Sequence, residues 1–217
     1  VAHASPPPPT QGQCWGFAPE GEALGPCPLT HTDVDVSISG FIARVNVTQS
    51  FTNPFDTPIE AVSTFPMSAR GAVDAMTMRI GDREIRGVVK EKGEARAIYE
   101  TARAAGQRAS LLDQERPNIF TQSVANILPG ENIEIEISYV EYLKYETGSY
   151  EFSFPMVVGP RYNPSSVTDA SKITPPVTPE GTRAGHDISL KVDLHAGVPL
   201  QGIHSELNKV EIDKDGY

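Results

Sequence analysis

The stretch "ENIEIEISYVEYL", residues 131–143, alternates apolar and polar side chains along most of its length. Ile133, Ile135 and Ile137 fall on one side of an extended chain, and Glu134 and Glu136 fall on the other. A period of two is typical of a β-strand with one face in a core and the other in water. The stretch therefore predicts a half-buried strand.

The same alternation continues toward the N-terminus. Val34, Val36 and Ile38 share one face, and the phase shifts after Gly40, as it does at a β-bulge. Beyond the glycine, the residues predicted to face inward are Phe41, Ala43, Val45, Val47 and Phe51. The chain thus carries a long strand pattern with one interruption.

Further strand patterns cover residues 59–65, 73–80, 85–89, 120–127, 150–154 and 188–194. Gly81 and Asp82 form a tight-turn signal, so the second and third of these stretches predict a hairpin. In the fifth, Tyr150, Phe152 and Phe154 lie on one side and are expected in the core. We predict a mainly β fold, an antiparallel β-sandwich-like domain.

One segment breaks the pattern and reads as an amphipathic helix inserted at about residues 91–105. Ala95, Ile98, Tyr99 and Ala102 recur at helical spacing and give one narrow apolar face. Gly106 supplies a stop signal. An alanine-rich face of this kind favours close packing on a sheet.

The two ends of the chain differ from its middle. Residues 1–30 are rich in Pro and Gly and are predicted to be a tether, in which Cys14 and Cys27 form a disulfide, with free thiols as the alternative. A disulfide implies an oxidising, extracytoplasmic compartment. Residues 31–160 form the main domain, residues 161–185 a Pro-rich connector, and residues 186–217 an incomplete strand pair that leads to a missing downstream domain.

Composition and motifs disfavour several classes of function. A net charge of −10 disfavours nucleic acid and anionic membrane surfaces, and no apolar run approaches the length of a membrane span. There is no motif for a catalytic triad, a zinc protease, a phosphate loop or a dinucleotide site. We therefore expect a chain that is not an enzyme and that has no catalytic residue, cofactor or metal site.

Five cues occur in one order: "FTNP" at 51–54, "GVVKEKGEARAIYETA" at 87–102, "RPNIF" at 116–120, "PGE" at 129–131 and "YEF" at 150–152. Residues 32–162 resemble the VIT domain, the module of vault poly(ADP-ribose) polymerase and the inter-alpha-trypsin inhibitor heavy chains. The likeness is strongest to bacterial cell-envelope versions. It implies a β-rich fold with one built-in helix, normally followed by a von Willebrand type A domain.

The resemblance makes a non-enzymatic interaction or scaffold module the first hypothesis, with the downstream von Willebrand type A domain or another protein as partner. Leu200, Ile203 and Leu207 are candidates for surface that such a partner covers. Glu115, Arg116 and Asn118 mark the junction after the helix, where we expect a buried Arg–carboxylate brace rather than a ligand contact.

A glycan-binding β domain is the alternative hypothesis. Tyr139, Tyr142, Tyr145 and Tyr150 are close enough in sequence to form an aromatic platform, although Tyr139 and Tyr150 are expected in the core. Asn46 lies in an N-glycosylation sequon and is predicted to point outward.

Overall fold

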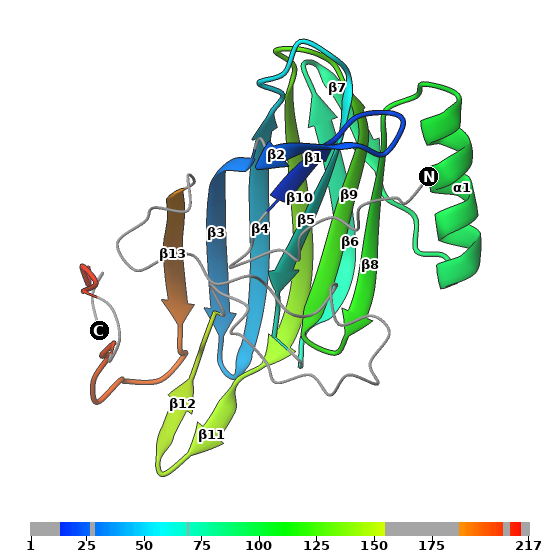
Figure 1. Cartoon of the computed structure of the whole chain (residues 1–217). Coiled ribbons are helices and arrows are strands. Elements are labelled where there is room, and N and C mark those ends of the chain that lie inside the picture. The colour runs from blue at the N-terminus through cyan, green and yellow to red at the C-terminus, as the bar shows by residue number, and fades with distance from the viewer. Residues whose placement is uncertain (1–13, 27–28, 69, 155–186, 206–208, 214–217) are drawn as a thin grey trace, which may run out of the picture.

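The structure is a computed structural model, and it describes residues 14–26, 29–68, 70–154, 187–205 and 209–213. Two large sheets pack face to face, one helix lies beside them, and a short hairpin extends from one end (Figure 1). One core cluster draws buried side chains from both sheets. The predicted sandwich-like, mainly β fold with a single helix is confirmed within these residues.

The larger sheet has six strands. In spatial order they are β13 (Asp187–His195), β3 (Leu29–Ser39), β4 (Ile42–Thr52), β10 (Asn132–Tyr142), β6 (Ala72–Ile80) and β7 (Arg83–Arg86). All neighbours are antiparallel except β13 and β3, which are parallel. Ile133, Ile135 and Ile137 are completely buried, which confirms the inward face predicted for this stretch.

The smaller sheet has five strands, in the order β2 (Ala23–Pro26), β1 (Cys14–Phe17), β5 (Ile59–Pro66), β9 (Ile119–Ile127) and β8 (Ala109–Arg116). β1 and β2 lie within the segment predicted to be a tether, and that prediction is wrong for residues 14–26. β1 pairs with β5, and a Cβ on Gly16 would lie only 3.0 Å from the ring of Phe55. Residues 14–26 are therefore ordered by pairing with β5, which is distant in the chain, and not by an alternation of apolar and polar side chains within the segment.

Gly40 and Phe41 form a two-residue turn between β3 and β4, so the β-bulge predicted here is wrong. Gly40 has φ +58, a conformation that a hairpin of this length takes readily with glycine. The turn places Phe41 outside the core, where it is exposed, whereas Ala43, Val45 and Val47 point inward as predicted.

The helix α1 spans Lys92–Ala104, close to the predicted 91–105. Glu91 caps its first turn by accepting hydrogen bonds from the N–H groups of Gly93 and Glu94. Tyr99 is its buried residue, and Ile98 is exposed, so the apolar face is narrower than predicted.

Beyond β10, the strands β11 (Lys144–Glu146) and β12 (Ser149–Glu151) pair only with each other, as the hairpin at the lower end of Figure 1. Tyr150 therefore lies outside the core and is exposed, against expectation, while Phe152 and Phe154 are half-buried against the core. The predicted connector, residues 161–185, lies outside the described residues.

Candidate interaction site

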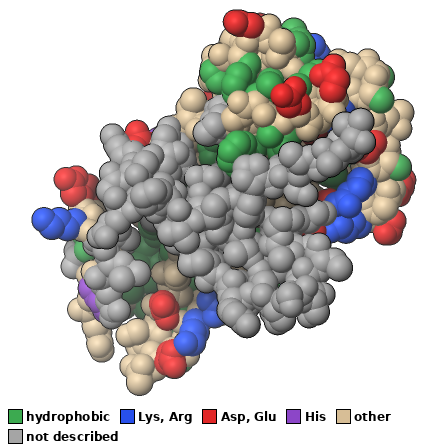
Figure 2. Space-filling view, viewed as in Figure 1, with side chains coloured by type: hydrophobic (Ala, Val, Ile, Leu, Met, Phe, Trp, Pro, Cys, Tyr) green, Lys and Arg blue, Asp and Glu red, His purple; other side chains and the backbone are tan. Residues whose placement is uncertain are grey.

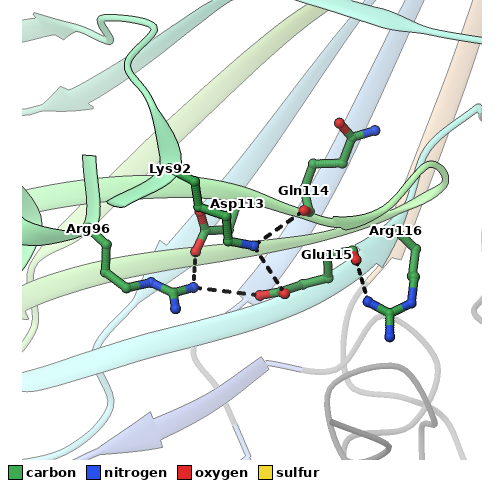
Figure 3. A network of polar contacts seen from close by, with 6 residues as sticks. All are labelled: Lys92, Arg96, Asp113, Gln114, Glu115 and Arg116. Atoms are coloured by element: carbon green, nitrogen blue, oxygen red, sulfur yellow. Dashed lines mark hydrogen bonds and ion pairs between the residues drawn. The ribbon is translucent and has the colours of Figure 1, made fainter. Parts of the chain in front are cut away.

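Helix α1 is joined to β8 by charged side chains (Figure 3). Arg96 donates a hydrogen bond to Asp113, and its Nη2 lies 3.9 Å from Oε1 of Glu115. Lys92 Nζ donates to Glu115 Oε2 at 3.3 Å and to the carbonyl oxygen of Gln114 at 3.4 Å. Two acidic residues of β8 therefore pair with two basic residues from successive turns of α1.

We call this cluster of charged side chains between α1 and β8 the seam, and its members are unequally buried. The Asp113 and Glu115 side chains are only 8% and 9% exposed, whereas those of Arg96 and Lys92 are 45% and 48% exposed. The hydrogen bond to Asp113 raises the pKa of Arg96 above its ordinary value. Both carboxylates are matched by cations, so the arrangement is suited to holding the helix in place rather than to proton transfer.

A second contact joins the helix to β5, farther across the same sheet. The Tyr99 hydroxyl donates to Glu60 Oε1 at 2.5 Å, and Arg103 Nε lies 3.0 Å from Glu60 Oε2. Burial and the Glu60 carboxylate raise the pKa of Tyr99. This cluster could not be predicted from the sequence, because nothing local to Glu60 indicates a partner 39 residues away.

The three residues predicted at the junction after the helix make structural contacts. Glu115 belongs to the seam, and Arg116 Nη1 donates to the carbonyl oxygen of Glu115 at 2.6 Å, in addition to a further interaction. The carbonyl oxygen of Asn118 accepts a hydrogen bond from the Met67 N–H at 3.2 Å. The carboxylate of Glu115 meets Lys92 and Arg96 of the helix, a partnership that the sequence analysis did not foresee. The bracing role of the junction stays a prediction.

The edge strand β13 carries an uncovered continuation of the core face. Its register places Leu190 beside Val34, Val192 beside Val36 and Leu194 beside Ile38. Residues paired in this way share a face of the sheet. The three β3 residues are 1–5% exposed, whereas their β13 neighbours are 36–44% exposed. The cover given by the opposite sheet therefore ends between β3 and β13.

The chain after β13 adds more exposed apolar surface. Val198 and the two predicted interaction residues Leu200 and Ile203 are exposed. The third predicted residue, Leu207, lies outside the described residues. We call the side chains of Leu190, Val192, Leu194, Leu200 and Ile203 the C-terminal apolar surface.

The remaining predicted features fall in different places. Tyr139 is buried, but Tyr142, Tyr145 and Tyr150 are exposed. Asn46 is half-buried in the middle of β4. Cys14 begins β1, while Cys27 lies outside the described residues, so the disulfide stays a prediction.

Within the described ranges, no group of three or more His, Cys, Asp or Glu residues is placed to hold a metal ion. In the coloured part of Figure 2, around the grey atoms, acidic and basic side chains both occur. The helix in the described part of the chain is too short and too polar to cross a membrane.

Comparison with known sequences places the fold in a family. The family model described as "Vault protein inter-alpha-trypsin domain" matches residues 29–139. The chain is 36% identical over 138 residues to protein mono-ADP-ribosyltransferase PARP4 of Mus musculus, covering 64% of this chain and 7% of that protein. It is 32% identical over 159 residues to von Willebrand factor A domain-containing protein 5A of Homo sapiens, covering 71% of this chain and 20% of that protein.

Inter-alpha-trypsin inhibitor heavy chain H4 of Homo sapiens is 32% identical over 120 residues, which cover 54% of this chain and 13% of that protein. The chain therefore spans a fifth or less of the length of these relatives. Among solved structures, an M1 zinc metallopeptidase from Deinococcus radiodurans aligns with 54% of this chain and 20% of its own, with 13% identity and a TM-score of 0.28.

Proposed function

Because the chain belongs to the Vault protein inter-alpha-trypsin domain family, we propose that it is a non-enzymatic protein-interaction module. Its partner in this proposal is a von Willebrand type A domain of the same protein. The docking site is the C-terminal apolar surface. The observation that carries the proposal is the uncovered row on β13, in register with the buried row on β3.

Exposed apolar side chains on a sheet face are costly to leave in water. Burying the exposed parts of Leu190, Val192 and Leu194 would contribute on the order of 1 kcal/mol for each side chain. Lys191 and Asp193, on the opposite face of β13, form an ion pair at 3.0 Å between Nζ and Oδ2. A partner that covers only the apolar face leaves this pair in water.

The choice of partner rests on the relatives. Von Willebrand factor A domain-containing protein 5A carries that domain in its name and matches 71% of this chain. We extend the proposed docking site to Leu200 and Ile203, which follow β13 in the chain and are exposed. In this proposal Leu207 belongs to the same surface.

An affinity titration of this chain with a separately produced von Willebrand type A domain of the same protein tests the proposal. We expect Val192→Glu to weaken binding roughly tenfold or more, because it places a charge in the contact. Lys191→Ala, one position away on the other face, is the matched control and should bind normally. Equal affinity of the wild-type and Val192→Glu chains would refute the docking site.

We also propose that the module is extracytoplasmic, on the grounds of a Cys14–Cys27 disulfide. A thiol assay on the denatured, unreduced chain should find no reactive cysteine, and the same assay after reduction should find both. Two reactive thiols before reduction, in protein purified from its native compartment under conditions that block exchange, would contradict this part of the proposal.

A further inference from the structure

The β11–β12 hairpin presents a pair of tyrosine rings to solvent. Tyr145 and Tyr150 are direct cross-strand partners, with ring centroids 4.9 Å apart and ring planes at 51°. They remain 63% and 56% exposed, so their contact with each other leaves much of both rings open.

A second exposed aromatic pair adjoins the hairpin. The rings of Phe41 and Tyr142 are stacked, with centroids 6.1 Å apart and planes at 19°. The Leu143 N–H donates to the carbonyl oxygen of Phe41 at 2.9 Å, which ties the β3–β4 turn to the base of the hairpin. Only Leu143 and Lys144 separate Tyr142 from Tyr145 along the chain.

The charges of the hairpin lie away from the rings. Successive residues of a strand point to opposite faces, so Lys144, Glu146 and Glu151 lie on the face opposite Tyr145 and Tyr150. Lys144 and Glu146 form an ion pair with each other there. The ring face offers aromatic surface and phenolic hydroxyl groups, with no charged side chain from β11 or β12.

The size of this surface limits what it can bind. A fully buried tyrosine contributes roughly 150–250 Å² of surface, so two rings that are a little over half exposed offer a few hundred Å² at most. A stable protein interface needs about 800 Å² from each partner. The ring pair therefore suits a small ligand better than a protein.

We propose that Tyr145 and Tyr150 form a binding site for a neutral oligosaccharide. A sugar ring has a C–H face that packs on an aromatic ring, and hydroxyl groups at its rim that bond to phenolic hydroxyls. The absence of charge on the ring face of the hairpin matches a neutral glycan rather than an acidic one. This site shares no residue with the C-terminal apolar surface, and the proposal does not depend on the proposed docking.

Saturation-transfer NMR on the whole chain tests the site, with maltohexaose, cellohexaose and chitohexaose as neutral probes and a polygalacturonate hexamer as the acidic comparison. We expect transfer to the C–H protons of at least one neutral probe and none to the acidic one. The double variant Tyr145→Leu/Tyr150→Leu keeps an apolar cross-strand contact but removes the rings, and should weaken binding at least about tenfold.

The variant Tyr145→Phe/Tyr150→Phe keeps both rings and should retain most of the binding. Val88→Ala, at a distant exposed apolar residue, is the control for nonspecific effects and should not change it. The proposal is overturned if no neutral probe receives saturation, or if the double leucine variant binds as the wild type does. It is also overturned if the tyrosine variants change self-association instead of glycan binding.

Discussion

At the scale of single residues, two buried tyrosines show how the same side chain takes opposite energetic roles. Tyr99 donates its hydroxyl to Glu60, whereas the Tyr139 hydroxyl is buried and has no hydrogen-bond partner in the described structure. Burial raises the pKa of both hydroxyls above the ordinary value of 10.0. The two therefore provide a matched pair of tests.

Tyr99→Phe should lower the free energy of unfolding by about 1–2 kcal/mol, because it removes a hydrogen bond to a charged acceptor. Tyr139→Phe should leave it unchanged or raise it, because it removes a buried hydroxyl without a partner. Urea denaturation of both variants at pH 7 checks the difference in sign. A large loss in Tyr139→Phe would show that its hydroxyl is satisfied after all.

The same tyrosines predict a dependence on alkaline pH. A pKa raised in the folded state means that the unfolded chain loses its proton first, so the stability is fully present below pH 10 and decreases as the pH rises above it. Each tyrosine contributes up to about 1.4 kcal/mol per pH unit in this window. Unfolding free energies measured at pH 9 and pH 11 should fall less steeply in Tyr99→Phe than in the wild type. Parallel slopes would contradict this account.

Asn53, within the "FTNP" cue, is a further structural residue. Its amide donates to the carbonyl oxygens of Thr57 at 2.8 Å and Ile127 at 2.9 Å, and its side-chain oxygen accepts from the Phe55 N–H at 2.8 Å. Asn53→Ala should lower the free energy of unfolding by about 2–4 kcal/mol, since it removes three hydrogen bonds and leaves the buried carbonyl oxygen of Ile127 without this donor. Asn132→Ala, at an exposed asparagine, is the control and should cost far less.

Strand alternation predicted the inward residues of β3, β4 and β10, because a period of two fixes which side chains share a face. It misplaced Phe41, which lies in the β3–β4 turn, and Tyr150, which lies in the β11–β12 hairpin. Parity gives no information on where a strand ends or with which strand it pairs. Strand alternation could not predict the contacts of Glu60 and Asn53, since these contacts join residues far apart in the chain.

At the scale of elements, the helix follows its sequence signals closely but is held mainly by polar contacts. Its predicted limits lie within a residue of the observed ones. Gly106 is a stop signal in the sequence, and Glu91 is the N-cap in the structure. Its packing was harder to predict, because the seam requires Asp113 and Glu115 to lie beneath Arg96 and Lys92. The position of Asp113 and Glu115 beneath the helix depends on the register of β8, which the helix sequence does not indicate.

Arg96→Ala should lower the free energy of unfolding by about 1–3 kcal/mol, because it leaves the Asp113 carboxylate buried without its cation. We place the effect toward the lower end, since Arg96 is nearly half exposed and its interaction is screened. Adding Asp113→Asn should restore part of the loss. The cost of Asp113→Asn would be measured alone and in the Arg96→Ala background. If that cost is the same in both, the two residues are not coupled.

At the scale of the whole molecule, the larger sheet has six strands and the smaller has five, and the apolar row on the edge strand β13 is exposed. The apolar alternation of residues 188–194 was visible in the sequence, but its position at an uncovered edge was not. Parallel pairing with β3 places this row in line with the core. The fold thus leaves a row of apolar side chains exposed at its edge, in register with a buried row of the core.

Cysteine labelling tests whether a von Willebrand type A domain covers the apolar row of β13. The rate of maleimide labelling would be measured at Val192→Cys and Lys191→Cys, in the free chain and with a saturating von Willebrand type A domain of the same protein. We expect labelling at position 192 to slow at least about tenfold and labelling at position 191 hardly to change. Unchanged labelling at position 192, at a concentration where the two proteins are bound, would contradict it.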